Sequence, residues 1–338
     1  VVQYFDNRYI NTIEIYDLNG NHVDTISMEA LGLAGRGALP QVFTTRSDSY
    51  RFEFNYNGIE QPNVTISYDI KSKKVEIKKS ALAEKFDSKI ISSEVAFITS
   101  EDGAEVPALL YSKKGTTPKY AYLAYYGSNG ILNPSTFNRK IQMHMEMGAL
   151  IVMVGPRGGG EKGAQWYIDG MKDRMKSVND VVAVSRWVKT RYPSIENRVV
   201  ASGRSYGGML TYALAVHAPE DFSILIPVVG IADLEFYKSD YHGSIGWDDL
   251  GYQRNKTGQL IVSKNTDTMI KKFSPYQNID KMKSVPAIMS FVTSQDERVG
   301  PHQGYVITSA LQKKFPDGNI FLLEQTGGHN ARTEAAEE

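Results

Sequence analysis

The spacing of apolar residues changes partway along the chain. Up to about residue 115, short segments alternate apolar and polar positions and end in turn signals, as in NTIEIYDL before Asn19-Gly20-Asn21 and SYRFEFNY before Asn57-Gly58. Similar segments are NVTISYDI, KKVEIKK and VPALLYS. A period of two that is closed by Asn-Gly turns is typical of antiparallel hairpins. We therefore predict an antiparallel β region in the N-terminal part.

After Tyr120 the pattern becomes one of apolar strands separated by helical stretches. The predicted strands are YAYLAYY, ALIVMV, RVVAS, SILIPVV, AIMSFVT and NIFLLE, and the predicted helices are 136–147, 172–192, 207–217 and 303–315. In the second helix, Val178, Val181, Val182 and Val188 recur near helical spacing. Strands and helices in alternation predict an α/β domain with a mostly parallel sheet that is covered on both faces.

The chain length indicates more than one domain. With 338 residues, of which 41% are hydrophobic, it can bury a sizeable core. We expect a β region over 1–88 and an α/β domain over 89–338. A β-propeller blade takes about 40 to 50 residues and a closed ring takes at least four blades. The β region is therefore too short to close a ring.

Charge and cysteine content narrow the possible partners and chemistry. Lys plus Arg and Asp plus Glu both total 38, with no long run of one sign, so neither a nucleic acid nor a membrane is expected as a partner. The absence of cysteine excludes disulfides and thiolate catalysis. We see no apolar run of membrane-spanning length and no signal pattern. We expect a cytoplasmic protein whose natural start lies upstream of Val1.

The motif Gly203-x-Ser205-x-Gly207 lies between a predicted strand and a predicted helix. This spacing is that of a nucleophile elbow, in which a sharp turn exposes the serine at the helix N-terminus. The alternative is a plain glycine-rich turn.

A serine nucleophile needs a histidine base and a carboxylate that orients the histidine. In enzymes with a nucleophile elbow, the three residues follow in the order Ser, Asp, His along the chain, each after a later strand. Asp296 follows the strand AIMSFVT, and His329 follows the last strand and is the one histidine of six in that position. A helix-capping carboxylate and a surface histidine are the alternatives. The order of the three residues predicts a triad of Ser205, Asp296 and His329.

Catalysis also requires donors for the developing oxyanion. The backbone N–H of Tyr206, just after the serine, is one candidate. The other is Tyr126, which ends an early strand in LAYYGSNG, although an aromatic residue that packs at a strand end explains it equally well.

Several stretches together resemble the prolyl oligopeptidase family of serine peptidases. They are AYYGSNG, GPRGGGEKGAQWY, GRSYGGML, KKFSPYQNI, DERV and GGHNA, and they cover nearly all of 90–338. The segment from IEIYDLNGNHVDTISM to VTISYDIKSKKVEI resembles the last propeller blade of that family. The resemblance implies an α/β-hydrolase fold. It also implies a C-terminal portion of a longer protein, whose propeller portion would be its partner, or an unusually reduced relative.

The resemblance also implies roles for individual residues. Ser205, Asp296 and His329 would be the triad, Tyr126 the phenolic oxyanion donor, and Arg298 a contact to the substrate backbone, unless Arg298 is a surface ion-pair partner. The substrate would be a short peptide, and no metal or organic cofactor is expected. In PRGGGE we expect Arg157 and Glu161 to form an ion pair that braces the glycine loop.

Specificity has two interpretations. Trp247 could stack on a substrate proline, which predicts cleavage after proline, and Arg298 agrees with this. The stretches WDDLG, QWYIDG and GGML look more like oligopeptidase B, in which carboxylates, here Asp248 and Asp249, would bind Lys or Arg. Gly246 stands where that group would have a glutamate, and both aspartates could be solvated loop residues. An esterase or acyl hydrolase with the same triad, or a non-catalytic binding module, are the remaining alternatives.

Overall fold

The computed structural model describes residues 2–6, 8–33, 35–45, 50–133, 135–237, 239, 250–251, 253–255 and 260–330. The chain divides into two compact units. One comprises Val1–Ala96, Leu109–Thr117 and Pro134–Ile151, and the other comprises Phe97–Ala108, Pro118–Asn133 and Val152–Glu338. The division expected from the sequence, at residue 88, stays a prediction.

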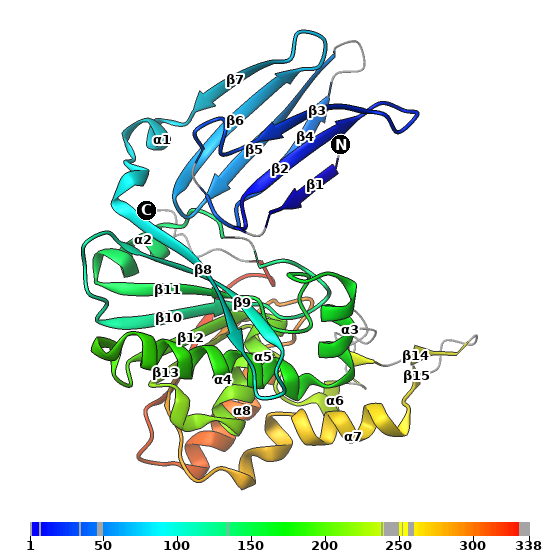
Figure 1. Cartoon of the computed structure of the whole chain (residues 1–338). Helices are drawn as coiled ribbons and strands as arrows, with labels where there is room; N and C mark the ends of the chain where they lie inside the picture. The colour runs from blue at the N-terminus through cyan, green and yellow to red at the C-terminus, as the bar shows by residue number, and fades with distance from the viewer. Residues whose placement is uncertain are drawn as a thin grey trace. The chain divides into compact units, whose positions relative to one another are not determined.

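The first unit contains two antiparallel sheets (Figure 1). One has the order β1-β2-β3, from Val2–Phe5, Asn11–Tyr16 and His22–Ser27. The other has the order β4-β5-β6-β7, from Leu39–Thr45, Arg51–Gly58, Gln61–Asp69 and Lys74–Lys79. The prediction of antiparallel hairpins is confirmed. β1, β3 and β4 were not predicted from the sequence. A short helix, α1 (Ala81–Lys85), follows β7.

A hydrophobic cluster joins the two antiparallel sheets of this unit. Alternate residues of β5 are buried, as its period-two pattern requires. The cluster draws on both sheets and includes Ile13, Ile15, Ile26, Phe52, Phe54, Tyr56, Val64, Ile66 and Tyr68.

The largest sheet has eight strands in the order β17-β16-β13-β12-β10-β11-β9-β8. Their bounds are Ile91–Thr99 (β8), Glu105–Lys113 (β9), Tyr120–Tyr125 (β10), Ala149–Val154 (β11), Val199–Arg204 (β12), Ile224–Val228 (β13), Ala287–Thr293 (β16) and Ile320–Gln325 (β17). From β10 through β12, β13 and β16 to β17, every neighbouring pair is parallel. All six strands predicted for this region are present, which confirms the mostly parallel sheet and the α/β-hydrolase fold class.

The helices of the α/β region are interleaved with these strands. Their bounds are Arg139–Glu146 (α2), Ala164–Lys172 (α3), Arg174–Arg191 (α4), Tyr206–His217 (α5), Leu234–Tyr237 (α6), Lys264–Phe273 (α7) and His302–Lys314 (α8). The four predicted helices correspond to α2, α4, α5 and α8. The sequence analysis did not predict α3, α6 and α7. A short hairpin, β14 (Gln253–Arg254) with β15 (Leu260–Ile261), precedes α7.

Helix α5 is the central helix of the fold. It packs on β12 and β13 (Figure 1), and α8 packs on β16 and β17. Every residue of α5 from Tyr206 to Val216 is buried. A helix that is apolar on all sides is typical of the middle of a large core. Within the described ranges, no helix combines the length and the apolar character needed to cross a bilayer.

Candidate active site

The predicted site residues follow the carboxyl ends of neighbouring parallel strands. The pairs Tyr125↔Gly203 and Thr293↔Gln325 show that these strand ends lie level with their neighbours. Because the strands are parallel, the loops that follow them emerge at one edge of the sheet. Those loops carry Tyr126 after β10, Ser205 after β12, Asp296 after β16 and His329 after β17.

Ser205 occupies a strained turn between β12 and α5. Its φ is 57° and its ψ is −117°, a left-handed conformation that non-glycine residues rarely adopt. The backbone N–H of Ser205 donates to Val228 O at 2.8 Å, which fixes the turn against β13. A Cβ added at Gly203 would lie 2.4 Å from Gly207 O, and one added at Gly207 would lie 2.7 Å from Tyr125 O, so the start of α5 packs closely on the ends of β12 and β10 because these positions lack side chains. This geometry is that of a nucleophile elbow.

Asp296 and His329 form a buried pair. His329 Nδ1 lies 2.8 Å from Asp296 Oδ2 and 2.9 Å from Oδ1, and both residues are 4% exposed. Asp296 Oδ1 also accepts the backbone N–H groups of Arg298 and Val299. Burial alone would raise the pKa of Asp296, but the hydrogen bonds from His329, Val299 and Arg298 outweigh it and lower the pKa below its ordinary value. The carboxylate is therefore ionised at neutral pH and holds the imidazole by Nδ1.

Within the described residues, no hydrogen bond joins Ser205 to His329, and the Ser205 side chain makes no helix-capping bond. Catalytic hydrogen bonds are often long in enzymes without substrate and tighten when it binds. The sheet thus places the Ser205 turn and the Asp296–His329 pair at the ends of parallel strands of one sheet. The catalytic role of the three residues stays a prediction at this point.

Two residues that the sequence analysis missed hold the backbone of His329. Glu297 Oε2 accepts the His329 N–H at 2.9 Å, and the Arg204 guanidinium donates to the His329 carbonyl oxygen. The hydrogen bond from the His329 N–H is the largest contribution that lowers the pKa of Glu297 below its ordinary value. No motif in the sequence signals these contacts, because Arg204 and His329 are 125 positions apart.

Tyr126 and Tyr206, the two predicted oxyanion residues, lie against each other. Their ring centroids are 6.5 Å apart in an edge-to-face arrangement. The Asn129 side-chain amide donates to the Tyr126 phenol oxygen at 3.1 Å. A buried guanidinium, that of Arg174, donates to Gly127 O at 3.1 Å and lies 6.0 Å from the centroid of the Tyr206 ring. Asn129 and Arg174 were also missed by the sequence analysis.

The expected ion pair between Arg157 and Glu161 is wrong. Arg157 instead donates to Asp180 at 2.9 Å and 2.6 Å and also bonds Asp102. Arg157 is 3% exposed and Asp180 is fully buried, so each charge requires the other. The expectation relied on closeness in sequence, whereas Asp180 on α4 is 23 positions away.

Glu161 has a different role in the same loop. Its side chain lies between Gly155 and Gly159, since a Cβ added at either glycine would collide with it. Glu161 Oε1 accepts the N–H of Asn133, and the Asn133 side chain donates to Ala124 O near the end of β10. Burial raises the pKa of Glu161 to about 7.

The predicted specificity residues are only partly described. The Arg298 side chain is 53% exposed, and its Nε lies 3.9 Å from Glu297 Oε1. This distance is that of a weak surface ion pair. Trp247, Asp248 and Asp249 lie outside the described residues.

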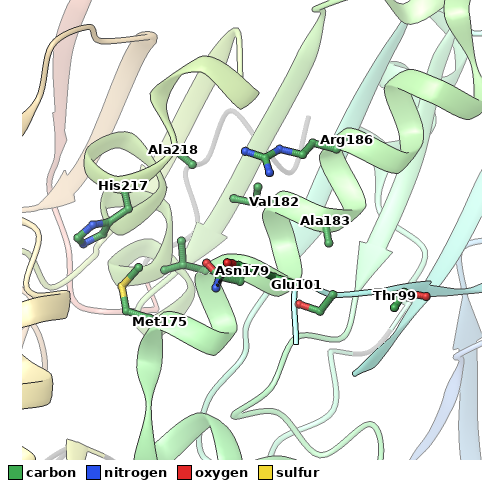
Figure 2. Close-up of a pocket in the computed structure, with 11 residues that line it drawn as sticks. Thr99, Glu101, Met175, Asn179, Val182, Ala183, Arg186, His217 and Ala218 are labelled. Carbon is green, nitrogen blue, oxygen red and sulfur yellow. Dashed lines mark hydrogen bonds between the residues drawn. The ribbon is translucent and has the colours of Figure 1, made fainter. Parts of the chain in front are cut away.

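A cavity of about 490 Å³ lies in the second unit (Figure 2). It is lined by one face of α4, by Thr99–Glu101 and by His217 at the end of α5. Ser205 precedes α5 at the opposite end, and a helix of 12 residues spans roughly 18 Å. His217 Nε2 bonds Phe273 O, and burial lowers the pKa of His217. This cavity is therefore separate from the candidate active site.

Comparison with known proteins identifies the family of the chain. The model of the prolyl oligopeptidase family, Peptidase_S9, matches residues 135–338, so the chain belongs to that family. Prolyl endopeptidases from Elizabethkingia miricola and Dictyostelium discoideum are 28% and 27% identical over 331 and 334 residues. These matches cover 95% and 94% of this chain but 44% and 42% of the relatives, so the chain spans less than half their length.

Solved structures share the fold. The match to a post-proline cleaving enzyme from Rickettsia typhi has a TM-score of 0.81 at 23% identity and covers 97% of this chain and 46% of the other. A match to a solved prolyl endopeptidase has a TM-score of 0.84 at 19% identity, with 97% and 47% covered.

Proposed function

We propose that this chain carries the catalytic apparatus of a serine peptidase that cleaves short peptides after proline. The observation that supports this most is the buried Asp296–His329 hydrogen bond at the same sheet edge as the strained Ser205 turn. The relatives named prolyl endopeptidases favour proline at the cleavage site.

In the proposed reaction, Ser205 Oγ attacks the peptide carbonyl carbon and His329 Nε2 takes the hydroxyl proton. Asp296 keeps the proton on Nδ1 and stabilises the imidazolium that forms. The Tyr126 phenol and the Tyr206 N–H donate to the oxyanion. His329 then protonates the leaving amine, the acyl-enzyme forms, and water hydrolyses it by the reverse sequence of proton transfers.

Labelling by a fluorophosphonate probe tests the nucleophile directly. We expect the probe to attach to Ser205 in the 338-residue chain, and the Ser205→Ala variant to remain unlabelled. Ser202, which bonds Ile226 O from within β12, provides the matched control, because Ser202→Ala should label like the parent chain. A label that survives in Ser205→Ala would contradict the proposal.

A substrate panel tests the specificity. Fluorogenic peptides that differ only in Pro, Ala, Lys or Arg before the scissile bond should give the highest kcat/KM for Pro. A preference for Lys or Arg, or hydrolysis of esters without amides, would contradict cleavage after proline. It would not contradict the role of Ser205 as the nucleophile.

Arg298 belongs to the same proposal as a contact to the substrate backbone. Its half-exposed guanidinium, directly after the Asp296 loop, supports this role. Arg298→Met should raise KM for the proline peptide, with little change in kcat, because binding of substrate and transition state would weaken equally. An unchanged KM would assign Arg298 to the surface pair with Glu297 alone.

The proposal extends to a partner, the N-terminal propeller portion of a longer protein. The chain spans 44% of the relative from Elizabethkingia miricola, which supports this extension. The reading frame upstream of Val1 tests it, and we expect several hundred further codons with blade repeats. A start codon directly before Val1 would contradict this part and leave the chemistry untouched.

A further inference from the structure

Asn129 lies three residues after Tyr126, in the loop that follows β10. Its side chain is exposed, and its Nδ2 donates to the Tyr126 phenol oxygen at 3.1 Å. An amide nitrogen can only donate, so the phenol oxygen is the acceptor in this bond. The phenol proton therefore points away from Asn129.

A hydrogen bond to the phenol oxygen strengthens the phenol as a hydrogen-bond donor. Hydrogen bonds in a chain polarise one another, so a phenol that accepts one bond donates the next more strongly. An oxyanion donor must also be oriented before the charge develops. The Asn129 amide can do both: its hydrogen bond polarises the phenol, and it holds the phenol oxygen so that the phenol proton points away from Asn129.

The loop that carries Asn129 is itself held in place. Its backbone makes two bonds to the glycine-rich loop after β11, from Gly130 N to Gly158 O and from Gly160 N to Ile131 O. Arg174 adds a third bond, to Gly127 O. These three hydrogen bonds hold the loop that carries the Asn129 amide.

Backbone conformation offers a competing explanation for an asparagine here. Asn129 has a φ of 56°, and asparagine tolerates this left-handed region better than most residues. Under that explanation the side-chain amide is incidental, and glycine would serve as well. The two explanations therefore differ in their expectation for Asn129→Gly.

We propose that Asn129 is a positioning residue that orients the Tyr126 phenol as an oxyanion donor. This rests on the proposed function, in which Tyr126 stabilises the oxyanion. Asn129 itself does not contact the reacting atoms.

The first test is Asn129→Gly in the 338-residue chain, with the proline peptide as substrate. We expect kcat to fall by roughly threefold to tenfold, the effect of one lost hydrogen bond, with KM unchanged because the bond acts in the transition state. The control is Glu196→Gly, at another positive-φ position (φ 52°) with a side chain that is 71% exposed, and it should leave kcat unchanged. A parental kcat in Asn129→Gly would overturn the proposal.

The second test asks whether Asn129 acts through Tyr126. In a Tyr126→Phe background, Asn129→Gly should have no further effect on kcat, because the phenol that it orients is gone. An equal fall of kcat in both backgrounds would assign Asn129 to loop structure and overturn the proposal.

The third test reverses the polarity of the bond. Asn129→Asp keeps the shape, but an ionised carboxylate can only accept, so it would draw the phenol proton to itself. We expect a larger loss of kcat than in Asn129→Gly at pH 8, where the exposed carboxylate is ionised. A loss in Asn129→Asp no larger than that in Asn129→Gly would contradict the orientation that we infer.

Fluorophosphonate labelling separates the two proposals. If the parent chain labels at Ser205 and the Asn129 variants keep the parental kcat, the inference fails and the proposed function stands. If the parent chain does not label, the proposed function fails first.

Discussion

The Arg204 guanidinium donates a hydrogen bond to the backbone carbonyl of His329. Arg204 directly precedes Ser205, so the residue before the proposed nucleophile holds the backbone of the proposed base. Glu297, next to Asp296, holds the N–H of the same histidine. The backbone of His329 is therefore held by neighbours of both Ser205 and Asp296.

Removing the Arg204 guanidinium should impair catalysis without unfolding the chain. In Arg204→Met the alkyl stem remains but the donors are lost, so the His329 loop can shift. Small displacements of a catalytic group can cost about 100-fold in rate, and we expect kcat to fall by about 10-fold to 100-fold. Arg198→Met, at an exposed arginine six residues earlier, is the control and should keep the parental kcat. Equal rates in the two variants would refute this role of Arg204.

Replacing Asp296 by asparagine should nearly abolish turnover while preserving shape. The amide donates to His329 Nδ1, which forces the imidazole proton onto Nε2 and removes the base for Ser205. The same exchange in a serine protease triad lowers kcat by about 10⁴, and we expect a similar loss here, measured with the proline peptide. Asp317→Asn, in an exposed loop, is the control. A loss below tenfold in Asp296→Asn would contradict the proposed triad.

The pH dependence of stability should contain a contribution from Glu161. Burial raises its pKa from 4.5 to about 7, so the folded state binds the proton more tightly than the unfolded state. The free energy of unfolding should then fall as the pH rises from about 4.5 to about 7, by on the order of 3 kcal/mol. Glu161→Gln should remove this dependence.

Urea unfolding at pH 5 and pH 8, followed by tryptophan fluorescence, measures this effect. Glu161→Gln should be more stable than the parent chain at pH 8 and similar to it at pH 5. Glu196→Gln, at an exposed glutamate, should follow the parent chain at both pH values. If the free energy of unfolding of Glu161→Gln still falls between pH 5 and pH 8 as it does in the parent chain, the pH dependence comes from other groups.

The two carboxylates that bind Arg157 should differ in their effect on stability. Asp180 is fully buried, whereas the Asp102 side chain is 43% exposed. Asp180→Asn leaves a buried guanidinium without its main counter-charge, and we expect a loss of about 3 to 5 kcal/mol in the free energy of unfolding. Asp102→Asn should cost about 1 kcal/mol or less, because water screens that pair. Equal losses by urea unfolding would contradict the burial argument.

The sequence predicted the parts of the fold in which local pattern is strong. Six apolar strands and the helices α2, α4, α5 and α8 were predicted from periodicity. The helix α7 was missed, although Ser263 caps it by accepting the Thr266 N–H. Its three buried residues, Met269, Ile270 and Phe273, lie on one face of a 10-residue helix whose other positions are polar, so few apolar residues mark it in the sequence.

The sequence also determined the order of Ser205, Asp296 and His329 and the turn at Gly203-x-Ser205-x-Gly207, because a parallel sheet converts the order of strands into loops at one edge. Only the tertiary structure decided that Arg157 pairs with Asp180 and that Arg204 and Glu297 bond the backbone of His329. Most of these hydrogen bonds join residues that are far apart in the sequence and require donor and acceptor to meet at hydrogen-bonding distance. Such distances follow from strand register and packing of the whole sheet, which no local stretch of sequence encodes.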